Sequence, residues 1–192
     1  MPNTFSLVAP LLPEIFALHA KWRPQQLAVV CGDERLNWQT FCAVNHRIAH
    51  GLLDSLELGE RVGIVMSNGL PMLHTLMGCM AAGLVSVPIN LSVSDEGLIN
   101  MLADAQVSAL VVSADQCERM LPLIARMPKT IKLWLADTEG DNFWMPLDDL
   151  MAGQRDSLPD VNIEPQAALN IIYSSGTTGL PKLAKHTHLN EL

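Results

Sequence analysis

The chain has little basic charge. Its 192 residues contain 12 lysines and arginines against 20 aspartates and glutamates, which gives a formal net charge of −8 at pH 7. Proteins that bind nucleic acid or anionic membranes present a basic surface to the phosphates. The composition therefore argues against both kinds of partner.

Paired cysteines and long hydrophobic runs are also missing. The four cysteines, Cys31, Cys42, Cys79 and Cys117, form no C-x-x-C pair and no metal-ligand spacing, so we expect free buried thiols in a reducing compartment. No stretch reaches the roughly 18 uninterrupted apolar residues that would predict a membrane span. The N-terminal residues lack the basic start of a signal peptide. Together these absences predict a cytoplasmic protein.

What is present is an ordinary globular composition, 49% hydrophobic and 17% charged, which suits one sizeable core. The negative charge is concentrated between residues 137 and 164. This stretch contains eight acidic residues and one basic residue, Arg155, so its net charge is eight minus one, or −7. We interpret this stretch as a solvated connection, the usual meaning of a run of like charges.

The hydrophobic pattern alternates between short apolar runs and stretches of helical period, which predicts an α/β fold of strand-helix units around a mostly parallel sheet. Pro71 and Ser94 suit the first turns of two of the helices. The predicted strands span 27–31, 35–38, 61–66, 84–89, 108–113, 131–135 and 169–173, and the predicted helices span 39–56, 71–82, 95–105 and 116–126.

Two prolines, Pro159 and Pro165, mark a plausible boundary between two α/β units. We predict a first α/β subdomain over residues 1–160. Residues 161–192 are then the truncated start of a second subdomain, which carries the motif described next.

The stretch "YSSGTTGLPKLAKHTH", residues 173–188, predicts an anion site directly after a strand. Backbone N–H groups in such a loop can form a nest while hydroxyls bond phosphate oxygens. Ligands of open α/β sheets bind beyond the carboxyl ends of strands, which is where this loop falls. The candidate phosphate-binding residues are Ser174, Ser175, Gly176, Thr177, Thr178, Gly179 and Lys182.

Other interpretations of the loop differ in how well they fit. A Walker A loop needs G-x-x-x-x-G-K-[ST], whereas Gly176 and Gly179 are three apart and Lys182 does not follow a glycine. A serine amidase would need a Gly-Gly-Ser-Ser-Gly setting, which is missing. A hairpin between two strands that binds no ligand stays open from the residue types alone.

Several other residues could bind a ligand or only pack. His46 and His50 lie four apart on a predicted helix, a spacing that suits a metal, but no third ligand is evident and a surface or core histidine pair is favoured. His186 and His188 follow the loop on an alternating, strand-like segment and either flank a site or only pack. We interpret the methionines as core residues, including Met66, Met72, Met77 and Met80.

The loop "YSSGTTGLPK" closely resembles the signature of the adenylate-forming, AMP-binding superfamily, usually Y-[ST]-S-G-[ST]-T-G-x-P-K-G. This superfamily includes acyl- and aryl-CoA synthetases, peptide-synthetase adenylation domains and luciferases. Upstream, "RLNWQTF" and "LGERVGIVMSNGLPMLHTLMGCMAAGLVSVPIN" resemble further family elements in the same order, and Thr187-His188 matches the [ST]-H that closes the signature strand. The resemblance extends over nearly the whole chain.

The resemblance implies a ligase that uses ATP, Mg²⁺ and a thiol such as coenzyme A. A carboxylic acid, fatty or aromatic, attacks the α-phosphate of ATP to give an acyl-adenylate and pyrophosphate, and the thiol then takes the acyl group. By position, Ser174 to Gly179 would wrap the phosphates and the Ser174 hydroxyl would face Mg²⁺. Lys182 would offset charge on the departing pyrophosphate, which is electrostatic positioning.

The resemblance has one departure and one gap. Leu183 replaces the glycine that usually follows Pro-Lys, which puts a side chain where the family has backbone flexibility. The family's adenine, acyl, ribose and catalytic lysine segments, and the CoA site, do not match any part of these 192 residues. We therefore expect an incomplete N-terminal domain whose segment from about residue 165 is poorly ordered or paired elsewhere.

Two functions follow for such a chain. The first is the N-terminal part of an acyl-CoA synthetase-like enzyme, inactive by itself. The second is a truncated remnant without catalysis that binds phosphate or a partner chain at most. A reading frame that continues past Leu192 into the remaining segments would favour the ligase.

Overall fold

The structure, a computed structural model, describes residues 10–138, 143–174 and 182–191. Its strands are β1 Leu27–Cys31, β2 Glu34–Asn37, β3 Arg61–Val65, β4 Val85–Pro88, β5 Ala109–Val112, β6 Leu133–Ala136, β7 Met145–Pro146, β8 Ala168–Ser174 and β9 Lys182–Thr187. Its α-helices are α1 Leu12–Trp22, α2 Trp38–Leu53, α3 Leu70–Ala81, α4 Asp95–Asp104, α5 Cys117–Met120 and α6 Leu147–Met151. Three 3₁₀ segments are η1 Ala114–Gln116, η2 Leu121–Arg126 and η3 His188–Glu191.

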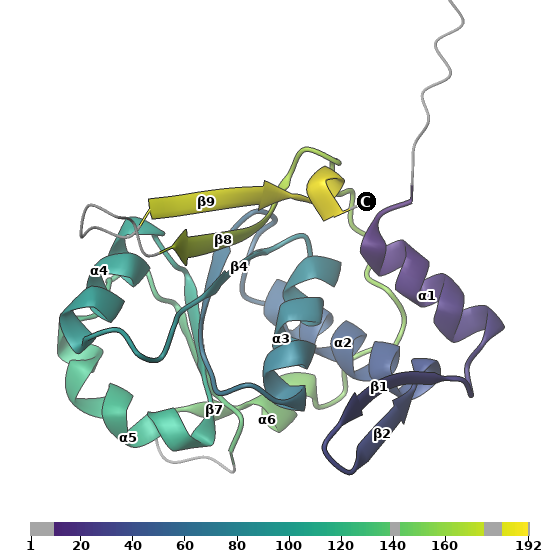
Figure 1. Ribbon diagram of the computed structural model, residues 1–192, viewed down its shortest axis with the longest axis horizontal. Coiled ribbons are helices and arrows are strands. Elements are labelled where there is room, and N and C mark those ends of the chain that lie inside the picture. Colours follow the sequence, from purple (N-terminus) through teal and green to yellow (C-terminus); the bar gives the residue numbers. More distant parts are fainter. Residues whose placement is uncertain (1–9, 139–142, 175–181, 192) are drawn as a thin grey trace, which may run out of the picture.

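A seven-stranded sheet in the order β7-β6-β5-β3-β4-β8-β9 forms the centre of the molecule, and β1 and β2 form a separate hairpin (Figure 1). Neighbouring strands of the large sheet run parallel, except that β9 is antiparallel to β8. The expected α/β fold with a mostly parallel sheet is confirmed.

Helices cover both faces of this sheet, with α4 and α5 on one side and α2, α3 and α6 on the other (Figure 1). All four residues of β5 are buried, as a strand covered on both faces requires. On one side Leu98 and Leu102 of α4 pack against the sheet. On the other, Ile48 and Leu52 of α2 do so.

Local signals explain where several helices begin. The Ser94 hydroxyl accepts a hydrogen bond from the Gly97 N–H at 3.2 Å, which caps α4 as predicted. The Asn37 side chain caps α2 in the same way, accepting from the Thr40 N–H at 2.8 Å. Pro71 lies in the first turn of α3, where its missing N–H costs no helical hydrogen bond.

Two sequence predictions need correction. The helix expected over 116–126 is split into α5 and the 3₁₀ segment η2, because Pro122 cannot continue an α-helical hydrogen-bond ladder. The acidic stretch is more than a solvated connection. It contains β7 and α6, and it buries Trp144, Leu147 and Leu150 in the two hydrophobic cores.

Smaller expectations are also settled. Helix α1 was not predicted; Pro13 lies in its first turn, where proline is well tolerated. Cys42 and Cys79 are buried, Cys31 and Cys117 are half-buried, and none of these four described cysteines forms a disulfide. Among the described residues, no helix has the length and apolar character needed to cross a membrane.

Strand β8 extends the sheet beyond the predicted boundary at residue 160. It pairs with β4 through Ser86 and Asn170 on one side, and it pairs with β9 along its length on the other. The segment after residue 165 is thus paired within the same chain, one of the two outcomes expected for it. The division into subdomains over 1–160 and 161–192 stays a prediction.

Candidate functional site

Strands β8 and β9 bring the two ends of the predicted phosphate loop together. Ser174 is the last residue of β8, Lys182 is the first of β9, and the two are register partners. Ser174 is exposed at the carboxyl end of its strand. The other candidate residues, 175–179, lie outside the described residues. The strands on either side of the predicted loop therefore pair as an antiparallel hairpin, an arrangement that leaves ligand binding by the loop a prediction.

The loop end of this hairpin is attached to α4 by Tyr173, the residue that precedes Ser174. The Tyr173 hydroxyl lies 2.7 Å from Asp104 Oδ2 and 3.1 Å from the Met101 carbonyl oxygen, and it can donate to either acceptor. Burial is the largest cause that raises the pKa of Tyr173, and the Asp104 carboxylate raises it further. No sequence pattern indicates this partner, which lies 69 residues earlier in the chain.

Leu183, which replaces the family's glycine, is a regular strand residue. In β9 it pairs with Tyr173 of β8, and the residue is 46% exposed. Among the described residues that are not glycine, only Gln106 has a positive φ. The backbone at Leu183 therefore does not need glycine in this conformation.

The histidines of helix α2 are packing residues. His46 Nδ1 lies 2.8 Å from the Asp156 carbonyl oxygen, and His50 Nε2 lies 2.9 Å from that of Ser157. Each ring donates to the chain after α6, and burial lowers the pKa of His46. Within residues 10–138, 143–174 and 182–191, no three His, Cys, Asp or Glu side chains form a possible metal site. Both histidines are buried, so they occupy the core rather than the surface, which were the two alternatives favoured for this pair.

The two histidines after the loop do not flank it closely. His186 pairs with Asn170, four residues along β9 from Lys182, a separation of roughly 13 Å in a strand. His188 follows β9, is buried, and its pKa is lowered by that burial. The methionines Met66 and Met80 are buried, Met72 packs partly buried against the core, and Met77 is half-buried.

A polar group at the carboxyl ends of β3, β5 and β6 was not predicted from the sequence. The Ser67 hydroxyl donates to Asp115 Oδ2 at 2.7 Å, and the Ser67 N–H donates to the Ser113 hydroxyl at 3.0 Å. Hydrogen bonds from Ser113, Gln116 and Ser67 lower the pKa of Asp115 to about 2. Burial raises the pKa of Asp137, whose carboxylate accepts from the Ala114 N–H. The polar groups at the carboxyl ends of these three strands therefore hydrogen-bond to one another.

A cavity of about 510 Å³ lies near this edge, between the β1–β2 hairpin and helices α2, α3 and α6. Its apolar wall includes Leu70, Leu147 and Met151, and its polar wall includes His74 and Asp137. No spacing in the sequence distinguishes these residues, since they come from separate segments.

The family of AMP-binding enzymes matches residues 16–192. A linear gramicidin synthase of Brevibacillus parabrevis is 30% identical over 179 residues, which are 90% of this chain and 2% of that protein. The 3-hydroxybenzoate–CoA ligase of an Aromatoleum species is 28% identical over 167 residues, which are 85% of this chain and 31% of that protein.

Solved structures show the same fold. A long-chain-fatty-acid–CoA ligase from Archaeoglobus fulgidus superposes with a TM-score of 0.81 at 22% identity, over 93% of this chain and 37% of that one. The chain thus spans less than two fifths of the length of each of these three relatives. Because the family match runs over nearly the whole chain and includes the loop motif, the chain belongs to the family of AMP-binding enzymes.

Proposed function

We propose that this chain supplies the phosphate-binding part of an ATP-dependent ligase that activates a carboxylic acid. The observation that supports this most directly is the phosphate-loop motif, between two strands whose paired ends are Ser174 and Lys182, in a chain of the AMP-binding family. Relatives named as aromatic-acid and fatty-acid CoA ligases favour a fatty or aromatic acid, with coenzyme A as the acceptor.

The proposed reaction has two displacements. A carboxylate oxygen of the acid attacks the α-phosphorus of ATP, the bond to the bridging oxygen breaks, and pyrophosphate leaves. The sulfur of the thiol then attacks the acyl carbonyl, and AMP leaves with the electron pair of the acyl-oxygen bond. In the first step the N–H groups and hydroxyls of residues 174–179 would bind the β- and γ-phosphates. The Lys182 ammonium would stabilise the negative charge that gathers on pyrophosphate.

The described residues are compatible with a magnesium ion at this position. Mg²⁺ prefers oxygen ligands and retains several waters when it binds together with substrate phosphates, so it needs few ligands from the protein. The exposed Ser174 hydroxyl at the end of β8 is a suitable single ligand. When bound, the ion would neutralise phosphate charge, while Ser174 would fix its place relative to β8.

A binding experiment tests the phosphate site. We expect isothermal titration of Mg²⁺-tripolyphosphate into the chain to show binding that Lys182→Ala weakens about tenfold, the value of one charge-assisted hydrogen bond. The matched control is Lys185→Ala, which removes the same charge from an exposed position further along β9. Equal losses in both variants would mean that only net charge matters, and the proposed site would be wrong.

An activity experiment tests the ligase. The native protein, as its gene encodes it, should exchange labelled pyrophosphate into ATP only when a suitable fatty or aromatic acid is added. Lys182→Ala should reduce this exchange. Binding of tripolyphosphate without exchange for any acid in a broad panel would favour the non-catalytic, phosphate-binding alternative.

A further inference from the structure

Tyr173 lies beside the proposed phosphate loop and has a specific partner outside the hairpin. Strand β8 is registered with β4 through Ser86 and Asn170, so residues 171–174 extend past that pairing. Along its whole length β8 is paired with β9, the edge strand of the sheet. The hydrogen bonds of the Tyr173 hydroxyl to Asp104 and to the Met101 carbonyl connect this end of β8 to α4.

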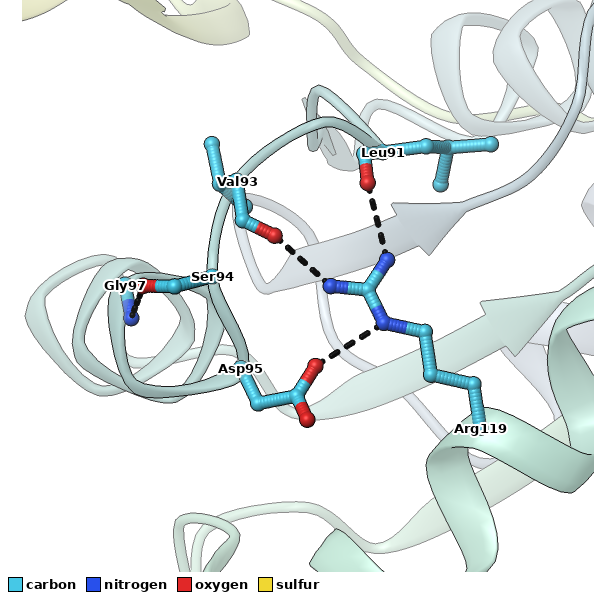
Figure 2. A network of polar contacts seen from close by, with 6 residues as sticks. All are labelled: Leu91, Val93, Ser94, Asp95, Gly97 and Arg119. Atoms are coloured by element: carbon cyan, nitrogen blue, oxygen red, sulfur yellow. Dashed lines mark hydrogen bonds and ion pairs between the residues drawn. The ribbon is translucent and has the colours of Figure 1, made fainter.

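Helix α4 is itself held at its other end. The Arg119 guanidinium donates to the carbonyl oxygens of Leu91 and Val93 at 2.9 and 2.7 Å, and it forms an ion pair with Asp95 at 2.9 Å (Figure 2). Figure 2 shows all three acceptors turned toward one guanidinium, beside the Ser94 cap of the helix. A planar guanidinium that donates to several acceptors fixes their relative positions more strictly than an ammonium could.

We propose that Tyr173 is a positioning residue for the phosphate site, and that its hydrogen bond to Asp104 fixes the carboxyl end of β8, and hence Ser174, against the Arg119-anchored helix α4. This inference rests on the proposed function. It adds the hydrogen-bonded pair Tyr173 and Asp104, a contact that the loop motif does not indicate. Asp104 touches no phosphate in this proposal and acts only through Tyr173.

The chemistry of the pair makes this role testable. The hydroxyl has one proton to share between the Asp104 carboxylate and the Met101 carbonyl, and the carboxylate is the nearer, charged acceptor. Phenylalanine would keep the half-buried ring and lose the bond. Asparagine at residue 104 would keep an acceptor of the same size, whereas alanine would remove both the acceptor and the charge.

The bond itself can be measured because Tyr173 is the only tyrosine of the chain. Tyrosinate absorbance at about pH 11, where an ordinary tyrosine is mostly ionised, reports on this residue alone. We expect the wild-type chain to show little tyrosinate there, and Asp104→Ala to show clearly more, because the carboxylate no longer raises the pKa of Tyr173. Equal ionisation in the two proteins would show that the bond does not form, which overturns the proposal.

The positioning role is measured by titrating Mg²⁺-tripolyphosphate into the full chain and its variants at neutral pH. Tyr173→Phe and Asp104→Ala should each weaken binding about fivefold, which corresponds to one hydrogen bond. Asp104→Asn should restore most of the affinity. The control is Glu118→Gln, which removes one exposed negative charge from α5.

The direction of the change separates positioning from charge. Removing a carboxylate near an anion site tightens anion binding if electrostatics alone acts, whereas loss of positioning weakens it. Tighter binding by Asp104→Ala, or equal binding by wild type and Tyr173→Phe, would overturn the positioning role and leave the proposed function standing. Absence of tripolyphosphate binding by the wild-type chain would count against the proposed phosphate site and the positioning role together.

Discussion

Among the histidines, His74 has the most strongly lowered pKa, and it lies in the contact between α3 and α2. Its Nδ1–H donates to Asn45 Oδ1 at 2.6 Å, and its ring lies 5.4 Å from that of Phe41. An amide oxygen only accepts, so the bond requires the proton on Nδ1. Burial lowers the pKa of His74 from 6.5 to about 4. The folded chain therefore holds this ring neutral at pH values where the unfolded chain protonates it.

This shift predicts a pH-dependent stability. The contribution is fully present above pH 6.5, the unfolded pKa, and is lost as pH falls toward the folded value near 4. Over that window the free energy of unfolding should drop by up to about 3 kcal/mol because of this residue. Urea unfolding of wild type and His74→Gln between those pH values measures it. The variant should lose less stability on acidification, and equal slopes for the two proteins would contradict the prediction.

Leu183 gives a second prediction at this scale. It occupies an ordinary paired position of β9 opposite Tyr173, so the family's glycine would add backbone freedom to a strand and remove a side chain. We expect Leu183→Gly to lower the free energy of unfolding by about 1 kcal/mol. Leu183→Ala is the control that separates the backbone effect from the loss of the side chain. A glycine variant more stable than wild type would mean that the backbone there is strained.

Among single residues, local signals in the sequence were reliable and distant ones were not. The Ser94 cap and the position of Pro71 followed from their neighbours, because a cap acts over three residues. The Tyr173 hydroxyl finds Asp104, and His46 finds the carbonyl of Asp156, only after the chain has folded. Such contacts have no sequence spacing by which they could be predicted.

At the scale of elements, the crossing of α2 and α3 depends on a glycine. A Cβ at Gly78 would lie 2.5 Å from Ile48 Cγ2 and 2.9 Å from Ile48 Cβ. The Ile48 atoms lie close to the α2 backbone, so they can retreat only if the helices separate. Alanine is the better helix former by about 1 kcal/mol, but forced overlap costs about 1–3 kcal/mol and should dominate.

We therefore expect Gly78→Ala to destabilise the chain by about 1–2 kcal/mol, measured by urea unfolding at neutral pH. The control is Gly69→Ala, where the new Cβ would meet its nearest neighbour, Pro71 Cδ, at an ordinary 3.6 Å. Gly69 has an extended φ of 171°, so alanine is not strained there. If Gly78→Ala were as stable as wild type, the two helices would have to pack less closely than the structure has them.

Helices and strands were predicted well where one hydrophobic period continued along the segment. They were predicted poorly where the hydrophobic period and the composition pointed to different structures. The strands at β3 and β5 stood out as apolar runs, because both of their faces are buried. Helix α6 was missed, because Asp148 and Asp149 are exposed while Leu147 and Leu150 face the core, and the acidic composition hid that short pattern. In 116–126 the helical period was predicted correctly, but Pro122 decided the hydrogen bonding.

At the scale of the whole molecule, alternating strands and helices predicted the class of fold but not the order of the sheet. From β3 the chain moves to one side to form β4, then crosses to the other side for β5, β6 and β7. It returns beside β4 only with β8. The position of each strand in the sheet depends on how the helices cover its two faces, and no short stretch of sequence contains that information. The motif at the end of β8 was nevertheless identified, because its residues are contiguous.

At the scale of the whole molecule, we expect that the proposed phosphate loop does not suffice for catalysis by itself. The chain spans 31% of the matched aromatic-acid ligase and 37% of the matched fatty-acid ligase. Holding the β- and γ-phosphates positions a leaving group, but the rate also depends on placing the carboxylate within reach of the α-phosphorus. We therefore expect the 192-residue chain to bind polyphosphate and to form no acyl-adenylate.

Incubation with ATP, Mg²⁺, coenzyme A and a panel of fatty and aromatic acids should release no acid-dependent pyrophosphate above a Lys182→Ala control. A complete acyl-CoA synthetase in the same assay shows that the conditions support the reaction. The result shows whether the chain only binds phosphate at the hairpin of β8 and β9 or also carries out the acid-dependent reaction. If the wild-type chain released pyrophosphate in response to one acid, and Lys182→Ala did not, then residues 1–192 would contain the acid-binding and adenine-binding groups as well. The cavity of about 510 Å³ beside Asp137 would then be the first place to search for them.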